Sequence, residues 1–218
     1  MRYPQLGHLF ALIACLGGMP GGVLAGTHEE SARPLQDQWA EIKYRVPEKQ
    51  QADRYHALAE QARQLVALQP ANAEAMIWQG IALSSEAGAK GGLGALSIAK
   101  AAKQQLETAM KYDDRALSGS AYTSLGVLYY KVPGWPLGFG DKTRAEELLK
   151  KALSINPTGI DPNFFSAEYL AERDRYAEAL RHLEIALRAP PRPGRDLADA
   201  GRRQEIQALI ARVRKEME

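Results

Sequence analysis

The chain has 218 residues, of which 28 are Lys or Arg, 26 are Asp or Glu and one is Cys, so its formal net charge is +2. The 45% share of hydrophobic residues argues against disorder, and a single Cys excludes a disulfide scaffold. The near-neutral charge argues against nucleic acid as a partner, because a nucleic-acid binder normally carries a basic face.

Residues 1–25 have the features of a secretory signal peptide. Arg2 supplies the positive start, an uncharged apolar stretch follows, and Val23-Leu24-Ala25 places small residues where a signal peptidase cleaves. We therefore predict a protein of the periplasm. Cys15 leaves an alternative open, because Leu12-Ile13-Ala14-Cys15 resembles a bacterial lipobox. Lipidation of Cys15 would make the protein a membrane lipoprotein, and the membrane is a partner only in that case.

The remaining sequence predicts one helix after another. Residues 26–34 are polar and are expected to be a flexible leader before a helical domain over 35–218. Pro34 opens the first helix and Pro47 ends it, because the residue before a proline avoids the helical conformation. Runs of alternating β-branched residues, which are typical of strands, are nearly absent. The sequence therefore predicts an all-α fold.

Four of the predicted helices end in similar segments, and these ends form an internal repeat. The repeated ends stop at Pro70, Asp114, Pro157 and Pro191, and the last two are 34 residues apart. The intervals before Pro157 are 44 and 43 residues, so two repeats carry roughly ten extra residues. We expect these extras in loops over 88–94 and 132–141. A long last helix from Asp196 is expected to cap the array, and a basic face that docks a partner is the alternative.

The residues in register with these ends resemble the tetratricopeptide repeat, a helix-turn-helix unit. The resemblance covers roughly residues 35–191 and is best in the third unit, where small residues alternate with large ones. It implies an α-solenoid of about four hairpins with a concave groove. The residues that carry it in the third unit are Tyr122, Leu125, Gly126, Tyr129, Ala145, Leu149, Ala152 and Pro157.

A narrower resemblance comes from the second extra segment. A Gly-Trp-Pro insert over residues 134–136, in a small secreted chain of such repeats, looks like the T component associated with tripartite ATP-independent periplasmic transporters. That resemblance implies work alongside a periplasmic solute-binding protein.

The sequence contains no recognisable catalytic or metal-binding constellation. His56 and His182 lie on predicted helices without a second His or a Cys one turn away, so we expect no metal and no cofactor. Glu168 and Glu172 stand one turn apart, but an acid–base pair would need burial and separated pKa values. We therefore expect a protein that is not an enzyme.

The register of the repeat assigns some positions to the groove. Aliphatic and aromatic residues would form its floor, polar residues its rim, and the two aromatic residues of the 132–141 segment either a lid or a pin for their own loop. The expected function is a binding or adaptor module for a protein, peptide or apolar ligand. A scaffold that self-associates or holds envelope proteins together is the alternative. The candidate binding residues are Ile77, Ile81, Val127, Tyr130, Lys131, Trp135, Phe139, Phe164 and Glu168.

Overall fold

A computed structural model describes residues 22–218, and this part of the chain consists of helices without a strand. The all-α prediction is confirmed. Residues 1–21, which hold most of the predicted signal peptide and Cys15, lie outside the described part. None of the described helices combines the length and apolar character needed to cross a membrane. The helices are α1 (Gly22–Arg45), α2 (Glu48–Leu68), α3 (Ala73–Lys90), α4 (Gly92–Tyr112), α5 (Ala116–Lys131), α6 (Lys142–Ile155), α7 (Ile160–Ala171), α8 (Tyr176–Arg188) and α9 (Asp196–Glu216).

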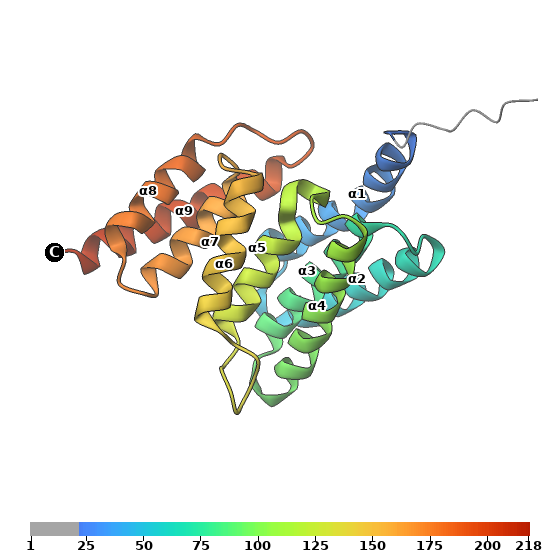
Figure 1. The fold of residues 1–218 in the computed structure, drawn as a ribbon, viewed down its shortest axis with the longest axis horizontal. Coiled ribbons are helices and arrows are strands. Elements are labelled where there is room, and N and C mark those ends of the chain that lie inside the picture. The colour runs from blue at the N-terminus through green and yellow to red at the C-terminus, as the bar shows by residue number, and fades with distance from the viewer. Residues whose placement is uncertain (1–21) are drawn as a thin grey trace, which may run out of the picture.

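The helices pack in a repeat-like order that follows the chain (Figure 1). Successive helices pack on each other as hairpins, and every odd-numbered helix also packs on the next odd-numbered one, from α1 through α9. The odd-numbered helices therefore form a continuous inner layer. One further contact joins α1 to α9, so the two ends of the array meet.

Glycines allow two of the hairpins to close tightly. A Cβ atom on Gly80 of α3 would lie 2.6 Å from Leu106 Cγ of α4, and one on Gly126 of α5 would lie 2.8 Å from Leu149 Cγ of α6. Both distances are far below a van der Waals contact, so a larger residue would force the helices apart. The sequence pattern predicts this alternation of small and large residues, and the packing confirms it.

Side-chain caps mark two of the helix starts. Asn72 accepts a hydrogen bond from the amide of Ala75 at the start of α3, and Asp141 accepts one from the amide of Arg144 at the start of α6. Such caps satisfy amides that have no partner within the helix. The sequence Pro70-Ala71-Asn72, a helix stop followed by a capping residue, predicts this start of α3, and the structure confirms it.

Two local predictions are wrong. Residues 26–34, expected to be a flexible leader, belong to α1, so Pro34 lies inside the helix that it was expected to open. Ala32 and Leu35 are buried against α2 and α3 residues. Residues 88–94, expected to be a loop, extend α3 and α4 instead, with a turn at Gly91, whose φ of 62° favours glycine. The additional residues of this repeat therefore lengthen its helices.

The 132–141 segment does form a loop, which projects beyond α5 and α6 at the bottom of Figure 1. The amide of Gly140 donates to the carbonyl of Pro133, and the amide of Asp141 donates to the carbonyl of Tyr129. These bonds tie the base of the loop to α5. At its tip, Trp135 is 90% exposed.

Candidate binding cavity

The inner layer surrounds a cavity of about 1640 Å³ that is open to solvent. One side is formed by α3, α5 and α7, and the other by α1 and α9. Both apolar and charged side chains line it, and they come from helices far apart in the sequence. The cavity is thus a product of the tertiary arrangement, since no single hairpin could form it.

Five of the nine predicted binding residues line this cavity. They occupy three successive odd-numbered helices. Ile81 and Val127 supply apolar surface, while the other three surround it with an aromatic ring and charge. These residues are Ile81, Val127, Lys131, Phe164 and Glu168.

Ile77 and Tyr130 do not line the cavity, contrary to expectation. Ile77 is completely buried in the core that α3 shares with α4 and α5. The inward residues of α3 include Glu74, Trp78 and Ile81, whose spacing of four and three residues defines one helical stripe. Ile77 lies one position, or about 100° of rotation, before Trp78. Trp78 therefore takes the place predicted for Ile77, while Ile81 lies on the stripe as predicted.

Tyr130 is buried between α5 and α7. Its ring lies 5.6 Å from that of Tyr169, and its hydroxyl donates a 2.6 Å hydrogen bond to Glu168. Burial, together with the nearby Glu168, raises the pKa of the Tyr130 hydroxyl well above its usual value, so it remains a donor. Tyr130 therefore lies behind the lining of the cavity and holds the side chain of Glu168 in position.

Glu168 and Glu172 share Lys131 as a cationic partner. Lys131 Nζ lies 3.2 Å from Glu168 Oε1 and also pairs with Glu172. The three side chains form one bridge between α5 and α7. Both carboxylates are thereby held in ion pairs with the same lysine.

Neither aromatic residue of the 132–141 loop lines the cavity. Phe139 packs edge-on against Tyr129 at 5.6 Å between ring centroids, so it pins the base of the loop. Trp135 points into solvent. The loop reaches the cavity through Pro133 and Leu137 instead.

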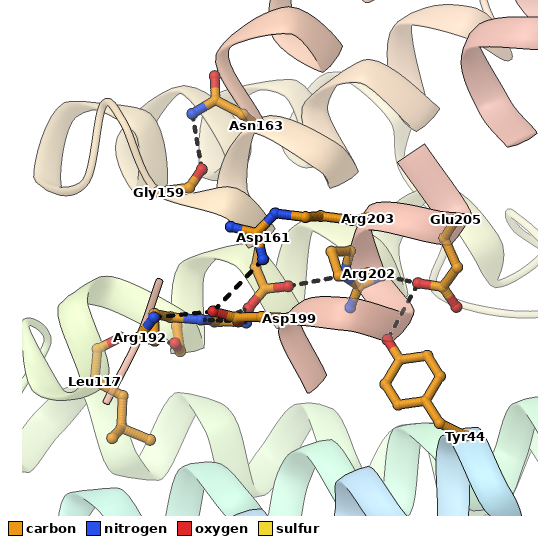
Figure 2. Close-up of polar contacts among 11 residues, drawn as sticks. Tyr44, Leu117, Gly159, Asp161, Asn163, Arg192, Asp199, Arg202, Arg203 and Glu205 are labelled. Carbon is orange, nitrogen blue, oxygen red and sulfur yellow. Dashed lines mark hydrogen bonds and ion pairs between the residues drawn. The ribbon is translucent and has the colours of Figure 1, made fainter. Parts of the chain in front are cut away.

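A network of Arg and Asp residues joins α9 to α7 beside the cavity (Figure 2). Asp161 of α7 accepts hydrogen bonds from Arg192 Nη1 at 2.5 Å and Arg202 Nε at 2.9 Å, while Asp199 accepts one from Arg192 Nε at 2.7 Å. Burial alone would raise the pKa of Asp161, but Arg202 and Arg192 hold it well below its usual range. Asp161 is therefore a permanent anion at neutral pH.

The same network reaches α1 through Glu205. Arg202 Nη1 donates to Glu205 Oε2 at 2.6 Å, and the hydroxyl of Tyr44 lies 3.3 Å from the same oxygen (Figure 2). Lys43 Nζ lies 3.3 Å from the other oxygen. A Cβ atom on Gly201 would lie 2.3 Å from Tyr44 Cε1, so glycine lets α1 approach α9 closely. These contacts join the ends of the array.

The sequence did not predict most of the side of the cavity that α1 and α9 form. The prediction treated the Arg-rich last helix as a cap and did not assign Arg192, Arg195 or Arg202 to the cavity, although all three line it. The signal that could have found them is the density of arginines from 192 to 203. Trp78 was missed because the register assigned its place to Ile77.

Within residues 22–218, no three His, Cys, Asp or Glu side chains lie close enough together to hold a metal ion. A scan against protein-family models gave no match to the chain. A search of the curated proteins also gave none.

Proposed function

We propose that this protein is a non-enzymatic binding module of the tetratricopeptide-repeat type, which takes up a ligand or a segment of a partner in its inner cavity. The observation that carries the proposal is the cavity of about 1640 Å³ lined by one face of three successive odd-numbered helices. Small-molecule pockets usually occupy about 300–1,000 Å³. The space is therefore large for a reaction centre and suits an extended ligand.

The repeat assignment draws on sequence and packing together. The close approaches at Gly80 and Gly126 occupy equivalent places in the second and third units, where the tetratricopeptide pattern has its glycine. All the odd-numbered helices line the cavity, joined by the starts of α2 and α4, and a concave inner layer of this kind is what a four-hairpin solenoid would have.

The charged groups of the cavity favour binding over catalysis. Asp161 is held by two arginines, and Glu168 by Lys131 and Tyr130. A general acid or base needs a pKa near the working pH, whereas the two arginines hold the pKa of Asp161 well below its usual range. Such pairs organise the walls of a binding site.

The setting we propose is the periplasm, following the predicted signal peptide over residues 1–25. In that compartment the module would work with a protein partner, and the resemblance of the 134–136 insert suggests a solute-binding protein as that partner. Trp135, 90% exposed at the loop tip, is available for such a contact, because buried tryptophans are among the strongest contributors to protein interfaces.

Filling the cavity tests the proposal. Ser124 is a small, half-buried lining residue of α5, and Ser154 is an exposed serine of α6 outside the cavity. We expect Ser124→Trp to weaken binding of the neutral apolar dye Nile red about tenfold, while Ser154→Trp leaves it unchanged. Circular dichroism checks that both variants fold, and Ser84→Trp on α3 fills the same space from another helix. Equal dye binding in all four proteins would refute the proposal.

A further inference from the structure

One arginine of the cavity wall differs from its neighbours in having an unsatisfied polar atom. Arg195 is the last residue before α9, and its Nε is buried without a hydrogen-bond partner in the described part of the chain. Its guanidinium lies 5.5 Å from the ring centroid of Trp78, a residue that lines the same cavity. The Nε itself is shielded from solvent, so a ligand in the cavity would meet the terminal Nη donors of this guanidinium.

The nearby carboxylates are already occupied by other arginines. Asp161 accepts from Arg192 and Arg202, and Asp199 accepts from Arg192. Burial, and after it the adjacent Arg192, lower the pKa of the Arg195 guanidinium from its usual value. The protein therefore leaves this cation less compensated than Arg192 or Arg202.

Like Arg195, the lining of the cavity as a whole is positively charged. Seven basic residues line the cavity against five acidic ones, so a bound anion would balance the excess. The basic residues are Arg33, Lys43, Lys131, Arg192, Arg195, Arg202 and Arg212, and the acidic ones are Glu48, Glu74, Asp161, Glu168 and Glu205.

Apolar surface adjoins this cationic position. Trp78 and Ile81 lie one turn apart on the inner side of α3, and Leu117 and Val127 line the cavity from α5. A ligand that places an anionic group at Arg195 would therefore meet aromatic and aliphatic side chains with the rest of its body. The arrangement fits an anion that carries an apolar chain.

We propose that Arg195 binds the carboxylate of an amphipathic organic acid whose apolar body occupies the cavity over Trp78 and Ile81. The guanidinium presents its donors in a planar fork that matches a carboxylate. This inference rests on the proposed binding function and adds the chemical class of the ligand to it.

The test uses three probes of graded chemistry: octanoate, its neutral counterpart 1-octanol, and acetate, which lacks the apolar chain. Isothermal titration calorimetry on the wild type is expected to give tighter binding of octanoate than of the other two. Arg195→Gln, which keeps much of the side-chain length, should weaken octanoate about tenfold or more and leave 1-octanol unchanged. Arg181→Gln removes the same charge from an exposed position on α8 outside the cavity and should change neither.

The outcomes separate this inference from the proposed function. Octanoate binding that is equal in wild type and Arg195→Gln would overturn the role of Arg195 and leave the cavity as a binding site. Acetate binding as tightly as octanoate would overturn the amphipathic class. Failure of octanoate to bind a wild type that does bind Nile red would also overturn the inference, whereas failure of both probes would count against the proposed function as well.

Discussion

Replacing Arg202 with Met should test how firmly the ends of the array are joined. The side chain of Arg202 is 7% exposed, donates to Asp161 and Glu205, and lies 4.5 Å from the ring centroid of Phe164. Removing one partner of a buried ion pair costs about 3–5 kcal/mol. Asp161 keeps Arg192 and Met fills the space of the stem, so we expect a loss of about 3 kcal/mol in the free energy of unfolding.

Urea unfolding followed by circular dichroism measures this loss. Arg214→Met is the matched control, because Arg214 is an exposed residue of the same helix, and we expect a change within about 0.5 kcal/mol. If Arg202→Met also changes the free energy by no more than that, the ion-pair network does not stabilise the fold. The reasoning about α9 as a structural wall would then be refuted.

Two further predictions concern the acid stability and the packing of the array. The pKa of folded Asp161 is depressed, so its stabilising effect is present above the unfolded pKa of about 3.9 and is lost as the pH falls below that value. Asp161→Asn should therefore flatten the decline of the free energy of unfolding in urea titrations between pH 7 and 3. An unchanged dependence of that free energy on pH would contradict the depressed pKa of Asp161. Gly126→Ala should lower the free energy of unfolding by about 1–3 kcal/mol, because the new Cβ would lie 2.8 Å from Leu149 Cγ. The double variant with Leu149→Val should lose less stability than the two single variants combined. Strictly additive losses in thermal unfolding would show that the two residues do not collide.

The features that sequence predicted well are local and periodic. The end of α1 before Pro47, the start of α3 after Asn72 and the long last helix all depend on caps, prolines and apolar spacing within a short segment. The close approach at Gly126 follows from one small residue in register with large ones. In each case the residues that give the signal lie within about one helical turn of the feature that they determine.

The features that sequence missed depend on contacts between distant segments. Residues 26–34 are polar on average, yet Ala32 and Leu35 become buried once α1 meets α2 and α3. Ile77 and Trp78 are both apolar, and only the rotation of α3 about its own axis, relative to the helices packed around it, decides which one faces the cavity. Propensity and periodicity cannot supply that rotation, because tertiary packing sets it.

Three of the arginines that line the cavity, Arg192, Arg195 and Arg202, could not be predicted from the sequence for a related reason. Arginines on a helix are usually solvated, and nothing within α9 distinguishes Arg202, which is buried, from Arg214, which is exposed. The distinction arises from Asp161, 41 residues earlier, and from the rings of Phe164 and Phe165 beneath the guanidinium.

The meeting of α1 and α9 has a consequence for how the molecule loosens. In an open array each unit touches only its neighbours, so the terminal units fray first and independently. Here Tyr44 and Glu205 link positions 161 residues apart, and neither terminus can peel away without releasing the other. Hydrogen exchange should therefore protect the first and last helices together, as one cooperative unit.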